Sequence, residues 1–343
     1  MLQFSRMIST VDAHTAGEPL RIITAGFPPI EGNTMLEKRR FVKENYDNLR
    51  KFLMLEPRGH SGMYGCLVTP AVTEDGDFGV LFMHNEGYST MCGHGIIAIT
   101  KVAVETGMIQ IDPNETRRQV NIDSPAGRIT AFADVADGKV SKVTFYNVPS
   151  FVYAENIEVP LAGIGSVTVD IAFGGAFYVF VDAQVLGLQV TPEHTDALVR
   201  LGMELKYKIM EKMDVVHPLE PELHGIYGTI ITEGISDGGN GVLVSKNVTI
   251  FADAQIDRSP TGTGTAARVA LLHKRGSLQA GMVLINSSII DTVFEGSIKE
   301  PAKVDRFDAI IPQVSGTAQI MGFNQFVLEP DDPLPEGFRI TGS

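Results

Sequence analysis

Two segments of this chain share an unusual pattern, in which a reactive side chain is followed by alternating glycines and then by an apolar run. The first reads Cys-Gly-His-Gly-Ile-Ile-Ala from Cys92, and the second reads Thr-Gly-Thr-Gly-Thr-Ala-Ala from Thr261. The apolar runs leave little polar face, as a buried helix requires. We therefore expect two similar halves, each with many strands wrapped around one buried helix.

The two central helices are predicted at Gly93–Glu105 and Gly262–Arg275. Gly107 and Gly276 follow them, and glycine commonly ends a helix. Elsewhere, segments rich in Val, Ile and Phe alternate with turn signals, which is typical of strands. The chain is therefore expected to be a mixed α/β (α+β) protein.

Two outer helices are also predicted, and both are expected to pack on the outside of a sheet. One begins at Thr34, whose capping box closes with Glu37, and continues to about Leu53. The other begins at Thr191, has proline in its first turn, and continues to about Met213.

The duplicated pattern suits proton chemistry at a carbon atom. Aligned backbone dipoles at a helix N-terminus stabilise a thiolate, so Cys92 is placed as a base. The glycines that follow expose backbone N–H groups able to hold a carboxylate. Two thiols in this pattern would form two opposed bases, but the second position is a hydroxyl, Thr261. The sequence therefore predicts a one-sided catalyst.

Composition narrows the class of protein. The 343 residues, 44% hydrophobic and 20% charged, are typical of a globular protein long enough for two domains. A net charge of −13 argues against nucleic acid and anionic membranes as partners, because both attract basic surfaces. The two cysteines are too few for a disulfide framework, and the N-terminus has no continuous apolar signal-peptide region. We expect a cytoplasmic homodimer that binds a small molecule.

Four blocks of the sequence carry a family resemblance: Asp12–Pro19, His84–Tyr88, Met91–His94 and Asp257–Pro260. They resemble the signature blocks of the proline racemase family, and they extend over essentially the whole chain. The resemblance implies the diaminopimelate epimerase-like fold, with two pseudo-symmetric domains and an active site in the cleft between them. The expected domains are residues 1–165, joined by a returning tail of about 326–343, and residues 166–325.

The resemblance also implies roles for individual residues, and it implies neither a cofactor nor a metal. Cys92 matches the base that acts on the L face, and Thr261 stands where racemases and 4-hydroxyproline epimerases of the family have a second catalytic cysteine. The positions that match the family's carboxylate-binding residues are Gly93, His94, Gly262 and Thr263. His94 and Asp257 match the side chains that bind the ring nitrogen of the substrate, and Phe251 and Tyr64 match two aromatic walls of the pocket.

A cysteine followed by a threonine is the pair carried by the family branch that removes water from trans-3-hydroxy-L-proline. The 3-hydroxyl of that substrate lies on the same ring face as the α-hydrogen, so the resemblance implies that Cys92 serves a syn elimination that yields pyrroline-2-carboxylate. The alternatives are a proline racemase or 4-hydroxyproline 2-epimerase, which the missing second thiol disfavours, and a non-catalytic imino-acid binding protein. A nucleotide-binding oxidoreductase is disfavoured because neither glycine run directly follows a buried strand. The other cysteine, Cys66, is expected to pack in the core.

Overall fold

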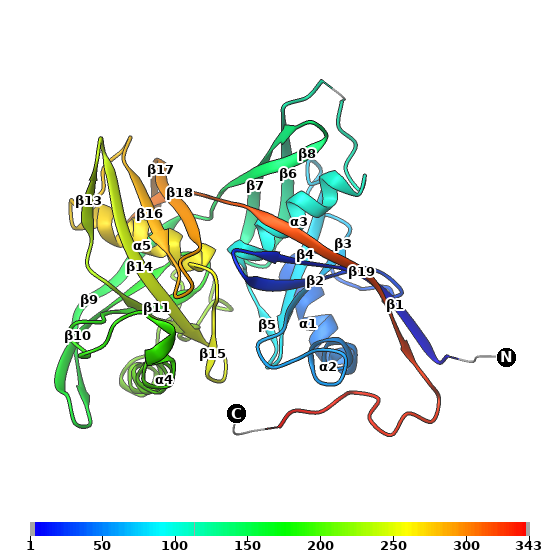
Figure 1. Ribbon diagram of the computed structural model, residues 1–343, viewed down its shortest axis with the longest axis horizontal. Helices are drawn as coiled ribbons and strands as arrows, with labels where there is room; N and C mark the ends of the chain where they lie inside the picture. The colour runs from blue at the N-terminus through cyan, green and yellow to red at the C-terminus, as the bar shows by residue number, and fades with distance from the viewer. Residues whose placement is uncertain (1–3, 113, 341–343) are drawn as a thin grey trace. The chain divides into compact units, whose positions relative to one another are not determined.

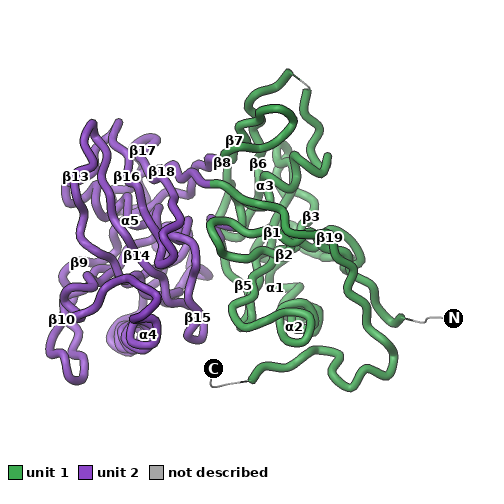
Figure 2. The backbone as a smooth tube through the Cα atoms, in the orientation of Figure 1, with its two compact units in different colours: residues 1–91, 95–143, 317–343 green, residues 92–94, 144–316 purple. Residues whose placement is uncertain are grey.

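The computed structural model describes residues 4–112 and 114–340. They form two compact units, coloured separately in Figure 2. The first contains residues 1–91, 95–143 and 317–343, and the second contains residues 92–94 and 144–316. The units differ in extent from the predicted domains, because the chain passes between them at Val143 and Thr144 and not near residue 165. The assignment of functional domains stays a prediction.

Eight strands of the second unit close into a ring by backbone pairing. The pairing runs β9-β10-β11-β12-β14-β16-β17-β18 and returns from β18 to β9, while β13 and β15 pair on β14 outside the ring. The strands are β9 (Ser150–Leu161), β10 (Gly165–Phe173), β11 (Phe177–Asp182), β12 (Gly228–Thr232), β13 (Ser236–Gly239), β14 (Val242–Phe251), β15 (Gln255–Ile256), β16 (Val283–Ser287), β17 (Val293–Val304) and β18 (Phe307–Gly316).

The ring surrounds a helix that is buried from Gly262 to Leu272, α5 (Gly262–Lys274) (Figure 1). The helix contacts β9, β10, β17 and β18, and small residues allow the close approach. A methyl on Gly174 would lie 2.2 Å from the carbonyl oxygen of Thr263 in the first turn of α5. The predicted helix at this position is confirmed, with Gly276 in the left-handed conformation one residue beyond its C-cap.

The second outer helix covers the ring from outside. A short 3₁₀ turn, η1 (Pro192–His194), leads into α4 (Thr195–Lys212), so the predicted single helix is a 3₁₀ turn followed by an α-helix. The helix packs on β12 and β14, where a methyl on Gly202 would lie 2.7 Å from a side-chain carbon of Ile250.

The first unit repeats the same order of strands and pairings. Its strands pair as β19-β1-β2-β3-β4-β6-β7, with β5 on β4. Parallel pairs join β2 to β3 and β4 to β6, just as they join β11 to β12 and β14 to β16 in the second unit. The predicted duplication is therefore confirmed. The strands are β1 (Arg6–Thr15), β2 (Glu18–Ala25), β3 (Tyr64–Thr69), β4 (Phe78–His84), β5 (Tyr88–Ser89), β6 (Arg117–Ser124), β7 (Gly127–Ala136) and β19 (Ala318–Leu328). The strand β8 (Lys139–Tyr146) begins in the first unit and ends in the second.

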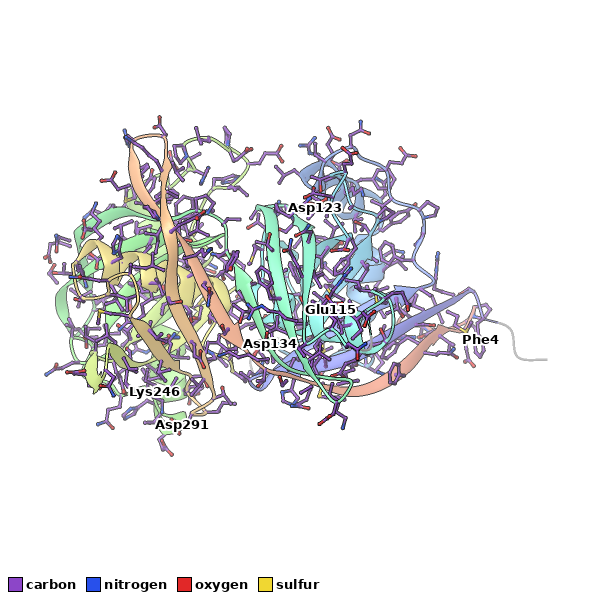
Figure 3. All side chains as sticks on the ribbon, turned by 90° about the horizontal axis from the view of Figure 1, so that it is seen from above. Phe4, Glu115, Asp123, Asp134, Lys246 and Asp291 are labelled. Carbon is purple, nitrogen blue, oxygen red and sulfur yellow. The ribbon has the colours of Figure 1, made fainter. Side chains whose placement is uncertain are left out.

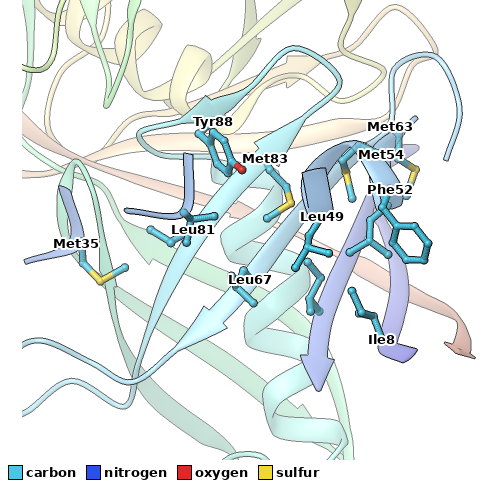
Figure 4. Close-up of a cluster of buried hydrophobic side chains, with 13 residues drawn as sticks. Ile8, Met35, Leu49, Phe52, Met54, Met63, Leu67, Leu81, Met83 and Tyr88 are labelled. Carbon is cyan, nitrogen blue, oxygen red and sulfur yellow. The ribbon is translucent and has the colours of Figure 1, made fainter. Parts of the chain in front are cut away.

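The first unit also has its predicted central helix, α3 (Gly93–Glu105), whose apolar residues are almost wholly buried. The outer element, expected as one helix, is two: α1 (Met35–Asn45) and α2 (Asp47–Met54). The capping box of Thr34 and Glu37 is present, but Tyr46 leaves the helical conformation at φ −133° and ψ 22°. The Tyr46 ring contacts the edges of Phe27 and Phe41, and both helices lay apolar side chains on the sheet (Figure 4).

Cys66 is fully buried in β3, and burial raises the pKa of its thiol, so the predicted packing role is confirmed. Charged side chains occur in both environments among the residues labelled in Figure 3, since Asp123 is buried and Asp291 is exposed. Lys246 and Asp291 form an ion pair at 2.6 Å, yet the Asp291 side chain is 80% exposed. Such exposed pairs contribute little to stability. Within residues 4–112 and 114–340, no helix combines the length and apolar character needed to cross a membrane.

Candidate active site

Cys92 is a buried cysteine that directly precedes α3, and residues 92–94 belong to the second unit. Its Sγ lies 3.2 Å from Nδ1 and 3.7 Å from Nε2 of His94, which is itself buried. An imidazole at this distance from a sulfur at a helix N-terminus favours the thiolate, especially when the ring is protonated. The role of Cys92 as a base stays a prediction.

Gly93 and Gly262, the first residues of the two central helices, have their backbones in contact. A methyl on Gly93 would lie 2.4 Å from the Cα of Gly262, and a methyl on Gly262 would lie 2.4 Å from the Cα of Gly93. The second methyl would also lie 3.2 Å from the backbone nitrogen of His94. Both positions therefore require glycine, and their contact brings two sets of helix N-terminal N–H groups to one place.

Thr261 is the N-cap residue of α5, with a φ of +64° that non-glycine residues seldom adopt. Its hydroxyl donates to Oδ2 of Asp257 at 2.7 Å and lies 2.6 Å from Oγ1 of Thr249. The backbone N–H of Ser259 donates to Oδ1 of the same carboxylate at 2.8 Å, and the N–H of Thr261 donates to the Ser259 hydroxyl at 3.1 Å. The buried turn from Asp257 to Thr261 is therefore held by its own side chains.

Tyr178 on β11 contacts a predicted site residue, and the sequence analysis did not single it out. Its hydroxyl lies 2.6 Å from Oγ1 of Thr263, and only 1% of the residue is exposed. Burial raises the pKa of Tyr178, the nearby Asp257 and Cys92 charges raise it further, and the Thr263 hydrogen bond opposes both. The phenol therefore stays neutral. The glycine pair of Phe173-Gly174-Gly175-Ala176, just before Tyr178, was the available signal, because a glycine there permits close approach to α5.

The two predicted aromatic walls lie in different units. Phe251, buried at the end of β14, stacks on Tyr227 with ring centroids 5.5 Å apart, and Tyr227 meets the ring of Tyr178 edge-on at 5.8 Å. Tyr64 lies in β3 of the first unit, where its hydroxyl is hydrogen-bonded to Ser89. The second unit thus groups every predicted site residue except Tyr64.

Histidines outside this group have structural partners. Nδ1 of His14 accepts from the N–H of Gly17 at 3.3 Å, and Nδ1 of His84 accepts from the N–H of Glu86 at 3.2 Å. Across the described ranges, no three His, Cys, Asp or Glu side chains gather as metal ligands would.

Known proteins resemble this chain along its whole length. The family model described as proline racemase matches residues 10–339. A protein of Bacillus thuringiensis subsp. konkukian named trans-3-hydroxy-L-proline dehydratase is 49% identical, covering 99% of this chain and 100% of its own. A proline racemase of Clostridioides difficile is 43% identical, covering 98% of this chain and 99% of its own.

A solved structure extends the likeness to the fold. The hydroxyproline epimerase of Agrobacterium vitis, with bound trans-4-hydroxy-L-proline, has a TM-score of 0.91 at 31% identity and covers 99% of this chain and 97% of its own. The chain belongs to the proline racemase family and is an enzyme with that family's α/β fold.

Proposed function

We propose that this protein is a hydro-lyase that removes water from trans-3-hydroxy-L-proline. The observation that carries the proposal is at the second helix N-terminus, where the hydroxyl of Thr261 donates to the Asp257 carboxylate. That position, the counterpart of Cys92 in the duplicated pattern, therefore offers no base. The name of the 49% identical relative from Bacillus thuringiensis supports the same reaction.

Substrate binding would use the groups gathered in the second unit. The carboxylate of the substrate is held by backbone N–H groups at the two helix N-termini, from Gly93, His94, Gly262 and Thr263. The ring nitrogen, a cation, is held by Asp257 with His94 beside it. Phe251 forms an apolar wall, and Tyr64 is kept as a proposed second wall.

The reaction begins when the Cys92 thiolate removes the α-hydrogen from the L face. The resulting negative charge spreads into the carboxylate, where the same N–H groups stabilise it. The C3–O bond then breaks, and the proton taken by Cys92 leaves with the hydroxide as water, either directly or through His94. Cys92 is again a thiolate, and the Δ2 enamine released tautomerises to Δ1-pyrroline-2-carboxylate.

The second candidate is an epimerase or racemase, which the names of the Clostridioides difficile and Agrobacterium vitis proteins favour. Epimerisation requires a proton donor on the D face. Thr261 is a weak acid, and giving up its proton would place an alkoxide beside the Asp257 carboxylate. Water loss from the carbanion is therefore favoured over protonation.

The test is to incubate the purified enzyme with trans-3-hydroxy-L-proline in deuterated water and to follow the products by proton NMR. The expected product is Δ1-pyrroline-2-carboxylate, which an added imine reductase would convert to proline. A 3-hydroxyproline epimer in its place would establish the epimerase alternative. Unchanged substrate without α-hydrogen exchange would point to a non-catalytic binding protein.

A further inference from the structure

Thr249 is a fully buried residue of β14 that touches both Thr261 and Asp257. Its Oγ1 lies 2.6 Å from Oγ1 of Thr261, and its backbone carbonyl accepts the N–H of Asp257 at 3.0 Å. The side chain of Asn247, two residues earlier on the same face of the strand, donates to the carbonyl of Pro260 at 3.2 Å. One face of β14 therefore holds the turn that carries the site.

The hydroxyl of Thr261 lies between Thr249 and Asp257. Each threonine hydroxyl has a single proton, and a carboxylate accepts only. The Thr261 hydroxyl donates to Oγ1 of Thr249 at 2.6 Å and to Oδ2 of Asp257 at 2.7 Å, so its one proton is shared between the two acceptors. A single hydroxyl of Thr261 therefore links Thr249 to Asp257.

We propose that Thr249 is a positioning residue, which acts through Thr261 to hold the Asp257 carboxylate in the orientation that binds the substrate's ring nitrogen. Thr261 has a strained backbone conformation, so its hydroxyl depends on a partner on each side to stay aligned. Without the Thr249 acceptor, the Thr261 hydroxyl loses one of its two partners and is free to turn away from the Asp257 carboxylate. Thr249 does not touch the substrate.

The inference rests on the proposed function only for the identity of the substrate, so the main measurement is direct binding. Pyrrole-2-carboxylate is a suitable probe, because it has a five-membered ring with a ring N–H and a carboxylate and undergoes no elimination. Its Kd is measured by calorimetry for the intact enzyme, Thr249→Val, Thr249→Ser, Thr261→Val and the double variant Thr249→Val/Thr261→Val. Steady-state kinetics with trans-3-hydroxy-L-proline accompany the titrations.

Thr249→Val is expected to weaken probe binding about five- to tenfold, the effect of one lost buried hydrogen bond, and Thr249→Ser is expected to restore it. In kinetics, KM should rise by a similar factor while kcat changes less. In the Thr261→Val background, Thr249→Val should have no further effect, because the residue through which it acts is already gone. Thr144→Val is the matched control, since Thr144 is a buried threonine of the same unit with a 2.9 Å hydroxyl contact to Ser315.

Equal weakening by Thr249→Val in both backgrounds would overturn the proposal, because it would show a structural role independent of Thr261. Unchanged probe binding in Thr249→Val would also overturn the proposal. An equal loss of probe affinity in Thr144→Val would do the same. If the intact enzyme forms no pyrroline product but the binding cycle behaves as expected, the proposed function fails and the role of Thr249 stands.

Discussion

The N-termini of α3 and α5 have the same glycine pattern but opposite chemical neighbours. Each begins with a glycine in contact with the other, and each follows a reactive side chain. Beside Cys92 lies an imidazole, 3.2 Å from the sulfur, whereas beside Thr261 lies a carboxylate, 2.7 Å from the hydroxyl. Cys92 and Thr261 therefore have equivalent places in the duplicated pattern. Their neighbouring side chains differ, and the neighbours of Cys92 favour a negative charge while those of Thr261 disfavour it.

This difference matters because both termini offer the same helix dipole. A protonated imidazole adds a positive charge that favours a thiolate, while a carboxylate disfavours any anion formed beside it. A helix dipole contributes about 0.3–1 kcal/mol at a surface and up to about 2 kcal/mol in partly buried geometries. Because both termini have this contribution, the charged neighbours make the difference between them. One terminus is suited to a base and the other to a fixed hydrogen-bond donor.

The largest expected effect comes from removing the base at the first terminus. Cys92→Ala should lower kcat for water elimination about 10³-fold or more, since a positioned general base contributes about 10²–10⁴-fold. The α-hydrogen exchange of L-proline in deuterated water should disappear with it. Both are measured by proton NMR.

Cys66→Ala is the control for that variant, because it removes the other buried thiol from β3 of the first unit. Its activity should stay within about twofold of the intact enzyme, with some loss of stability from the small cavity. If the two cysteine variants lost activity equally, Cys92 would be a structural residue and the comparison of termini would fail.

A smaller loss is expected from Asp257→Asn at the second terminus. Replacing the carboxylate removes a charge-assisted interaction with the ring nitrogen, worth about 1.5–3 kcal/mol, so kcat/KM should fall about 10- to 100-fold. The comparison predicts that this loss appears mainly in KM, because Asp257 binds and does not transfer the α-hydrogen. A variant with unchanged KM and a lowered kcat would assign Asp257 to the chemistry instead.

The sequence predicted the parts of the molecule that depend on local signals. Gly107 and Gly276 correctly marked the ends of the central helices, and the capping box at Thr34 marked the start of α1. The break at Tyr46 was missed because the helical period continues through it, and the ring contacts of Tyr46 with Phe27 and Phe41 are not visible in that period. Sequence patterns predict such an element more reliably than its interruptions.

The site shows the same limit. The motifs around Cys92 and Thr261 predicted which residues belong to the candidate site, but not the contacts among them. Thr249 and Tyr178 reach the site from β14 and β11, and their roles depend on which strand face points inward and on how the ring closes. Those are long-range properties of the fold, so a single sequence could not indicate them.

The smallest expected effect, and the most direct test of the comparison, is a gain of function in Thr261→Cys. A thiol at the N-terminus of α5 would benefit from the helix dipole, but the Asp257 carboxylate beside it opposes the thiolate. We therefore expect slow α-hydrogen exchange of D-proline, at least about tenfold slower than exchange of L-proline through Cys92. The double variant Cys92→Ala/Thr261→Cys should keep the D-proline exchange and lose the L-proline exchange. If the intact enzyme already exchanged both enantiomers equally, Thr261 would not separate the two faces, and the epimerase alternative would be favoured over the hydro-lyase.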